Sequence, residues 1–237
     1  MSDHLNEHDI KDFYETINEI WPAQEDWYVY AKNQIRKFLH DNPFLDNAYV
    51  LNAGSAGNDY DLPYKMHHVD IAKSKISHLD NATVASVENL PFKSSIFDNA
   101  ICVGSVINYC DAVVAISELC RVIKPNGILM LEFESSDGFE YRNTEEYRKA
   151  AVVVNVKYIE KSHTQWLYSY KYIKSILRET GFIIIKVFPF HTLSSLYLSK
   201  NADENRAAKF AKYDRFLRYL PRIRMHGNNI LIMCKKS

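Results

Sequence analysis

From Tyr49 onward, short apolar runs alternate with segments whose apolar residues recur at helical spacing. Such alternation predicts a parallel sheet with helices packed on its faces. A chain of 237 residues, 47% of them hydrophobic, can bury a core of that size, so we expect one domain over 1–237. The expected strands are 48–53, 66–71, 82–86, 97–103, 127–134, 182–187 and 229–234, and the expected helices are 8–20, 27–40, 111–124, 169–180 and 202–220.

The formal charge of the chain is zero, but its two ends carry opposite charge. Residues 1–30 hold eight acids and one Lys, whereas residues 200–237 hold ten Lys or Arg and three acids. A basic end can face phosphates or a membrane surface, and it can equally be a solvated helix face or a match for the acidic N-terminus. Charge alone therefore excludes none of these partner classes.

The four cysteines form no C-x-x-C pair, and three of them lie in apolar periodic segments. We expect them to be reduced thiols of the core. The N-terminus shows no apolar signal core, and no apolar run approaches the ~20 residues that span a bilayer. These features predict a cytoplasmic protein with no transmembrane segment. The pair His67-His68 has no further ligand types at suitable spacing, so we expect no metal site.

The stretch YVLNAGSAGNDY, residues 49–60, passes from an expected buried strand directly into Gly54 and Gly57. Gly54 stands at the carboxyl end of a parallel strand, where open α/β sheets bind their ligands. Glycine permits a tight turn and lets a phosphate, a carboxylate or a polar cofactor edge approach backbone N–H groups. The alternative is a plain turn from strand to loop.

A second short strand ends in Asp70, sixteen positions after Gly54. A carboxylate there can accept hydrogen bonds from both hydroxyls of a ribose. Its alternative role is to cap a helix that begins near Ala72. The dinucleotide fingerprint would need glycine at two positions where the chain has Ala56 and Asp59, so NAD is disfavoured.

Two further stretches, SVENLPFKSSIFDNAICVGSVINY and ISELCRVIKPNGILMLE, join the glycine stretch and Asp70 in one pattern. In this order and spacing, over residues 45–135, they resemble the class I S-adenosylmethionine-dependent methyltransferases of the methyltransferase-11 type. The resemblance implies a doubly wound, Rossmann-like α/β fold with N-terminal helices and a seven-stranded sheet, in which 229–234 inserts antiparallel between the fifth and sixth strands. It divides the domain into an N-terminal helical cap (1–44), a cofactor-binding core (45–135) and an acceptor-side segment with the C-terminal strands (136–237).

The resemblance also implies that S-adenosyl-L-methionine is the cofactor. The glycine loop, the end of the second strand, the residues beside the adenine and the end of the fourth strand would bind it. These positions are Asn52, Gly54, Ser55, Ala56, Asp70, Ile71, Ser86, Val87, Glu88, Gly104 and Ser105.

The chain departs from the family pattern in this site. An acid is replaced by Asn52, two glycines by Ala56 and Asn58, and the acid beside the adenine by Ser86. Asn and Ser still offer hydrogen bonds, so we interpret the site as a modified cofactor site rather than one that has lost its function. The interval from Gly57 to the second strand also leaves no room for a long first crossover helix.

Methyl transfer from a sulfonium is an in-line displacement, in which the protein mainly aligns the nucleophile and excludes water. Asn108 and Tyr109 are expected on the methyl group's side of the pocket; as alternatives, Asn108 caps the helix at 111–124 and Tyr109 packs. For a hydroxyl acceptor a base would help, and the candidates are His163, Glu134 and His191, with His163 preferred because its segment commonly covers the active site in this fold. Tyr109 and His163 are thus the catalytic candidates, although a lone His among aromatics is more often a packed side chain.

The favoured function is methyl transfer to an O or N atom of a small-molecule or saccharide acceptor. One alternative is a noncatalytic cofactor-binding or partner-binding protein on the same fold, suggested by Asn52, Ala56 and Ser86. Another is a methyltransferase that acts on RNA or protein, since HTQWLYSYKY and KYDRFLRYLPRIRMHGNN mix aromatics with cations. No RNA-binding module or zinc pattern accompanies them, so nucleic acid ranks below a small or glycan-like acceptor.

Overall fold

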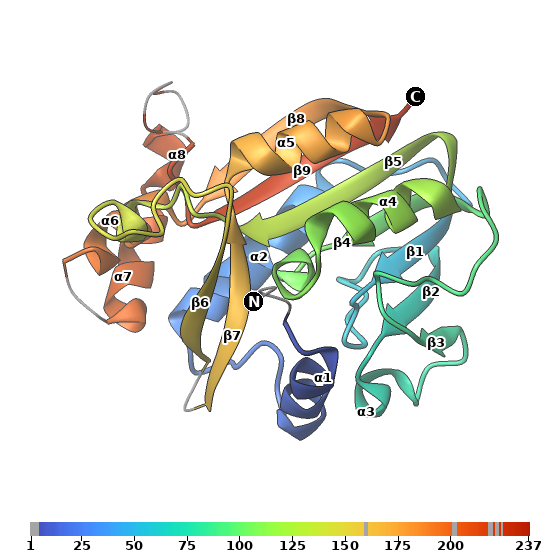
Figure 1. Ribbon diagram of the computed structural model, residues 1–237, viewed down its shortest axis with the longest axis horizontal. Helices are drawn as coiled ribbons and strands as arrows, with labels where there is room; N and C mark the ends of the chain where they lie inside the picture. The colour runs from blue at the N-terminus through green and yellow to red at the C-terminus, as the bar shows by residue number, and fades with distance from the viewer. Residues whose placement is uncertain (1–4, 159–160, 201–202, 218–219, 221–222, 224) are drawn as a thin grey trace.

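The computed structural model describes residues 5–158, 161–200, 203–217, 220, 223 and 225–237. Its centre is a seven-stranded sheet in the order β3-β2-β1-β4-β5-β9-β8 (Figure 1). The five strands from β3 to β5 are parallel, as the alternating pattern predicts. The strands of this sheet are β1 (Tyr49–Ala53), β2 (Lys65–Asp70), β3 (Ala82–Val84), β4 (Phe97–Cys102), β5 (Ile123–Glu134), β8 (Phe182–Phe190) and β9 (Asn229–Lys236).

The last strand, β9, lies between β5 and β8 and runs antiparallel to both. Met233 pairs with Met130 of β5 and with Lys186 of β8. Ile230, Leu231 and Ile232 are fully buried, which explains why this strand reads as a continuous apolar run. The expected insertion of 229–234 between the fifth and sixth strands is confirmed.

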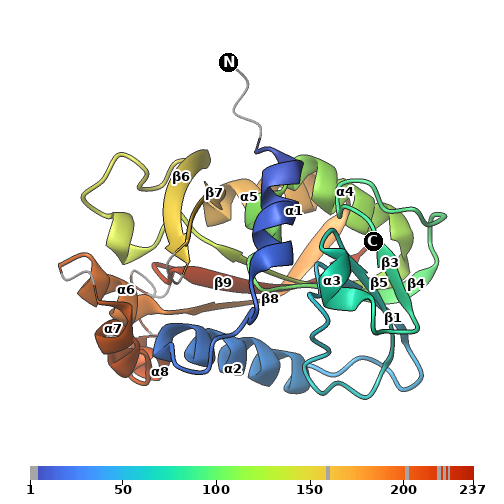
Figure 2. The same ribbon diagram turned by 90° about the horizontal axis from the view of Figure 1, so that it is seen from below.

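Helices cover both faces of the sheet, with α2 on one side and α4 and α5 on the other (Figure 2). Ala115, Leu119 and Val122 of α4 recur at helical spacing and are fully buried in one core cluster. The Asp111 side chain caps this helix by accepting from two backbone N–H groups. The helices are α1 (Glu7–Thr16), α2 (Asp26–His40), α3 (Lys73–Ile76), α4 (Ala112–Val122), α5 (Tyr170–Glu179), α6 (Thr192–Leu198), α7 (Glu204–Ala211) and α8 (Asp214–Leu217), with two short 3-10 turns, η1 (Val106–Tyr109) and η2 (Phe139–Tyr141).

Several boundaries differ from the sequence expectation. The helix expected over 8–20 ends at Thr16, and the one expected over 111–124 ends at Val122, where β5 begins. The helix expected over 202–220 falls partly outside the described residues and within them is broken into α7 and α8. Residues 54–64, between β1 and β2, hold no helix, as the short interval predicts.

A hairpin that the sequence pattern did not reveal projects from the carboxyl edge of the sheet. It consists of β6 (Ala151–Tyr158) and β7 (Lys161–Tyr168), which form a separate two-stranded antiparallel sheet. Helix α1 lies beside it (Figures 1 and 2), with Phe13 against the rings of Tyr158 and His163, and with Lys161 Nζ donating to Thr16 Oγ1 at 2.8 Å. The N-terminal helix and the hairpin therefore cover the same end of the sheet.

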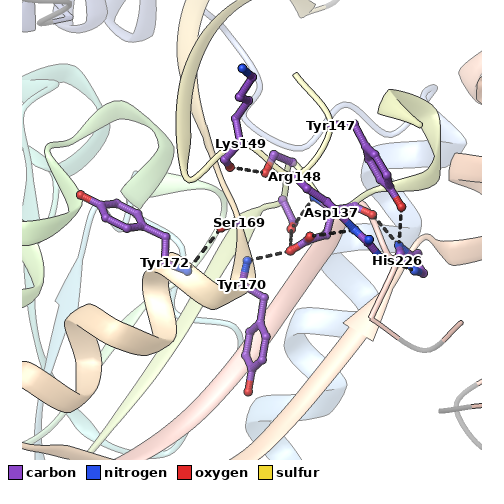
Figure 3. A network of polar contacts seen from close by, with 10 residues as sticks. Asp137, Tyr147, Arg148, Lys149, Ser169, Tyr170, Tyr172 and His226 are labelled. Carbon is purple, nitrogen blue, oxygen red and sulfur yellow. Dashed lines mark hydrogen bonds and ion pairs between the residues drawn. The ribbon is translucent and has the colours of Figure 1, made fainter. Parts of the chain in front are cut away.

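The loop that leads into this hairpin is held by Asp137 (Figure 3). Asp137 Oδ2 accepts from the backbone N–H of Tyr170 at 2.8 Å, in the first turn of α5. Its backbone carbonyl accepts from His226 Nδ1 at 2.9 Å, and the His226 ring stacks on Phe139. The Arg148 guanidinium lies 3.9 Å from Asp137 Oδ1. The Asp137 side chain thus joins the loop to α5, and the Asp137 backbone carbonyl joins the loop to the C-terminal segment.

Replacing Asp137 by Ala should lower the free energy of unfolding by about 1–3 kcal/mol, because a half-buried backbone donor at the start of α5 loses its acceptor. Asp137→Asn keeps one acceptor oxygen and should cost less. Urea unfolding followed by circular dichroism measures both, with the exposed Asp46→Ala as the control. A loss at Asp137 no larger than at Asp46 would show that this contact does not hold the loop.

Candidate functional site

A cavity of about 260 Å³ opens at the carboxyl ends of β1, β2 and β4. This is the edge at which open parallel sheets bind ligands. Most of the residues expected to bind the cofactor line it, namely Gly54, Ala56, Asp70, Ile71, Ser86, Val87, Glu88 and Gly104. The structure therefore brings together residues that are spread over fifty positions of sequence.

Two glycines of the loop after β1 have no room for a side chain. Gly54 has φ +67°, and a Cβ there would lie 2.3 Å from a methyl carbon of Val106. A Cβ on Gly57, with φ +77°, would lie 2.5 Å from the backbone oxygen of Lys75. The bare backbone is thus required by close approach of the chain itself and by left-handed torsion angles.

Asn52 and Ser55 do not line the cavity, although the sequence reading placed both among the cofactor contacts. Asn52 is buried behind the loop, and its Nδ2 donates to the Asn58 carbonyl at 2.8 Å. Ser55 Oγ accepts from the N–H of Gly57 at 3.2 Å. These two side chains shape the loop from behind.

Asp70 is buried at the end of β2 and holds two segments at once. Its Oδ2 accepts from the N–H of Ala56 in the glycine loop, and its Oδ1 accepts from the N–H of Ala72, both at 2.8 Å. Burial raises the pKa of this carboxyl, an effect opposed by the two backbone hydrogen bonds. The short helix α3 has Ala72 as its N-cap, so Asp70 is not the N-cap residue itself but accepts from the backbone N–H of the residue that is. Each carboxylate oxygen keeps a lone pair for a further donor.

The stretch Ser86-Val87-Glu88 forms another part of the cavity wall, beside Ile71. Ser86 Oγ accepts from the N–H of Glu88 at 3.3 Å. The Glu88 carboxylate accepts from the N–H of Asp111, next to α4. The wall therefore has an apolar part at Val87 and Ile71 and a polar edge at Ser86 and Glu88.

A second cavity, of about 240 Å³, adjoins the first. The two share Tyr14, Ile20, Gly104 and Tyr109 in their walls. The second lies among α1, α2, the β6-β7 hairpin and the ends of β5 and β9, and Ser105 opens onto it rather than onto the first. A group bound in one cavity can therefore meet a group bound in the other at the shared residues.

Glu132 lies in the wall of the second cavity and was not expected from sequence. It is fully buried, its Oε2 accepts from the N–H groups of Gly104 (2.9 Å) and Ser105 (2.7 Å), and its Oε1 accepts from Asn229 Nδ2 at 2.8 Å. Burial raises its pKa to about 7. An acid inside the apolar run LMLEFE is the signal that could have identified it.

The two catalytic candidates are hydrogen-bonded to each other, with the Tyr109 hydroxyl 2.7 Å from His163 Nε2. Both line the second cavity. Burial lowers the pKa of His163 to about 4 and raises that of Tyr109 well above its ordinary value. At neutral pH the pair is therefore uncharged.

The other polar candidates differ in their placement. Glu134 lines the second cavity, and its carboxylate accepts from Gln165 Nε2 at 2.5 Å and from Ser105 Oγ at 3.2 Å. His191 lines neither of these cavities, because its ring stacks on Trp27 with 3.6 Å between centroids. Asn108 is also fully buried and neither caps α4 nor lines these cavities; its Nδ2 donates to the carbonyls of Glu134 and Trp166.

Over the described parts of the chain, no three His, Cys, Asp or Glu side chains gather as a metal ion would need. In the same parts, no helix has both the length and the apolar character needed to cross a bilayer. The four cysteines, all in described segments, are free thiols, and Cys102, Cys110 and Cys234 are buried.

Comparisons with known proteins agree with this geometry. Residues 51–131 match the family model described as a methyltransferase domain. An uncharacterised protein of Methanocaldococcus jannaschii is 22% identical, over 90% of this chain and 92% of that one.

Two solved structures share the fold over nearly the whole chain. A possible histamine N-methyltransferase from Thermotoga maritima has a TM-score of 0.56 at 18% identity, covering 98% of this chain and 95% of that one. A geranyl diphosphate C-methyltransferase from Streptomyces coelicolor, solved with Mg²⁺, geranyl diphosphate and S-adenosyl-L-homocysteine, has a TM-score of 0.63 at 10% identity, covering 97% and 98%. Over residues 51–131 the chain thus matches a methyltransferase domain, and its seven-stranded sheet has the fold of the solved S-adenosylmethionine-dependent methyltransferases.

Proposed function

We propose that this protein transfers the methyl group of S-adenosylmethionine to an O or N atom of a small-molecule or saccharide acceptor. The observation that carries the proposal is the pair of adjoining cavities. The first is built from the motifs shared with the methyltransferase family, and the second meets it at Gly104 and Tyr109. A protein that only bound the cofactor would have no use for the second cavity.

In this proposal the first cavity holds the cofactor. Asp70 accepts from the ribose hydroxyls with the lone pairs that its two backbone donors leave open. Ile71 and Val87 flank the adenine, with Ser86 and Glu88 at its polar edge. The backbone of Gly54, Ala56 and Gly104 lies against the methionine part, with Asn52 and Ser55 keeping the loop in shape and Ser105 at the junction of the cavities. When bound, the cofactor supplies an activated methyl group with its leaving group attached.

The acceptor then occupies the second cavity, which is small and partly covered by α1 and the hairpin. Tyr109 stands at the junction and orients the acceptor, and for a hydroxyl acceptor the neutral His163 behind it accepts the proton. The S. coelicolor relative contains geranyl diphosphate, a small acceptor, on the same fold. A covered cavity of about 240 Å³ favours a small acceptor over RNA or a protein.

Asp70 provides the first test of this proposal. Asp70→Asn should weaken binding of S-adenosylhomocysteine at least about tenfold, because hydrogen bonds to a charged group contribute ~1.5–3 kcal/mol and ~1.4 kcal/mol is one decade. Since Asp70 also accepts from Ala56 and Ala72, the amide loses one backbone partner, and the protein should be less stable too. Calorimetry measures the affinity, and thermal unfolding measures the stability.

A ligand change separates the ribose role from loop bracing. The parent protein should prefer S-adenosylhomocysteine to its 2′,3′-dideoxy analogue, and Asp70→Asn should lose that preference. Asp80→Asn, at an exposed acid just before β3, is the control. A preference that survives unchanged in Asp70→Asn would assign the ribose contact to another residue, and no binding to the parent at millimolar concentration would remove the cofactor proposal.

The pH dependence of His163 provides a second test. With a pKa lowered from 6.5 to about 4, the ring stays neutral and able to accept a proton down to about pH 5. Between pH 4 and 6.5 the unfolded chain binds a proton that the folded chain does not, so His163 makes the protein less stable as the pH falls through this window. Histidine NMR titration, with the resonance assigned by its loss in His163→Gln, should give a midpoint near 4; a midpoint above 6 would contradict the buried, neutral base.

A further inference from the structure

The second cavity is unusually rich in acids. Glu132, Glu134 and Glu140 line it from β5 and η2, and the exposed Glu204 stands at its edge on α7. The one Lys or Arg among its described lining residues is Lys157, which is exposed on β6. Glu132 is fully buried and Glu134 and Glu140 are half-buried, and carboxyl groups withdrawn from water cost free energy unless a positive charge or several donors compensate them.

No cation of the described chain neutralises these acids. Among the residues that the structure describes, no Lys or Arg lies within 4.0 Å of the carboxylates of Glu132, Glu134 or Glu140. Their partners are neutral donors: backbone N–H groups and Asn229 for Glu132, Gln165 and Ser105 for Glu134, and Asn228 for Glu140. Burial accordingly raises the pKa of Glu134, and that of Glu140 to about 8.

Asn229 gives an independent indication of what the cavity binds. Its side chain lines the cavity, the residue is 5% exposed, and its Oδ1 has no hydrogen-bond partner. Its Nδ2 donates to Glu132, so turning the amide would set oxygen against the carboxylate whenever Glu132 is ionised. A buried acceptor without a donor calls for a ligand that brings N–H groups.

The rest of the wall is aromatic. Trp21, Tyr28 and Tyr158 line the cavity, and the Tyr28 and Tyr158 rings meet edge to face at 4.9 Å. Aromatic faces attract organic cations, and this attraction grows when water is excluded. Acids, an unpaired carbonyl oxygen and aromatic rings all favour the same kind of ligand.

We propose that this cavity binds the methyl acceptor as a small organic ammonium ion, so that the atom methylated is an amine nitrogen. The inference rests on the proposed function and narrows its acceptor from O or N to a cationic amine. Of the two acids next to the junction, Glu132 has both oxygens held by backbone N–H groups and Asn229, whereas Glu134 contacts the Ser105 hydroxyl beside Gly104.

The transfer step then balances as follows. The ammonium gives one N–H proton to the Glu134 carboxylate, which leaves a lone pair on nitrogen. That lone pair forms a bond to the methyl carbon while the carbon–sulfur bond breaks and its electron pair stays on sulfur. The sulfonium becomes a neutral thioether, and the nitrogen carries the added methyl group and the positive charge.

Three probes of matched shape test the inference on the full chain saturated with S-adenosylhomocysteine. They are 2-phenylethylamine, a cation at neutral pH, 2-phenylethanol, which is neutral, and phenylacetate, an anion. The amine should bind about tenfold more tightly than the alcohol, the gain of one charge-assisted hydrogen bond, and the carboxylate should bind most weakly. Equal binding of amine and alcohol, preference for the carboxylate, or no binding of the amine at millimolar concentration would each overturn the inference.

Variants locate the effect. Glu134→Gln and Glu140→Gln keep the shape and most hydrogen bonds, and each should reduce the preference for amine over alcohol by about tenfold. Glu145→Gln, at an exposed acid on the same segment, should leave it unchanged. Affinity for S-adenosylhomocysteine serves as the folding check and as the separate test of the proposed function: its loss in the parent sinks that function, whereas retained cofactor affinity without amine preference sinks this inference alone.

Discussion

The site depends on one buried carboxyl group. Glu132, inside β5, accepts from the backbone at the end of β4 and from Asn229 at the start of β9. It thereby fixes Gly104, one of the residues that both cavities share, against the two strands beside it. A carboxyl group without water requires this many donors, so the local backbone has little freedom to differ. The junction at which a methyl group would pass is set by this contact.

The two sides of the site are built differently, and this explains how far the sequence could predict them. The cofactor side consists of short motifs at the ends of successive strands, so Gly54, Asp70 and the Ser86-Val87-Glu88 wall could be located from order and spacing alone. The acceptor side is assembled from α1, the hairpin, β5 and β9, which are far apart in the chain. No local sequence pattern predicts the hydrogen bond between Glu132 and Asn229, because it forms only when β9 pairs with β5.

The errors have physical causes as well. Asn52 belongs to β1 and Ser55 to the loop after it, but strand alternation and the turn direct their side chains behind that loop, which motif matching does not reveal. The sequence pattern does not predict the hairpin, because residues 151–158 mix apolar and polar residues and no turn signal separates them from the next strand. His191 has a side chain that can act as a general base, yet its ring stacks on Trp27 and burial lowers its pKa to about 3. Burial decided its role, and burial is a tertiary property.

The position of β9 has a consequence for how the protein is made. On the ribosome the chain emerges from its N-terminus, so β1 to β5 and then β8 are available before residues 229–236. Within the described sheet, β8 has β9 as its neighbour, and β5 presents a bare edge until β9 arrives. A nascent chain therefore carries an unpaired β8 and a bare edge of β5 until β9 leaves the exit tunnel, and exposed strand edges of this kind are templates for pairing with another chain. Insertion of the eight residues of β9 is therefore the last step in forming the sheet during synthesis.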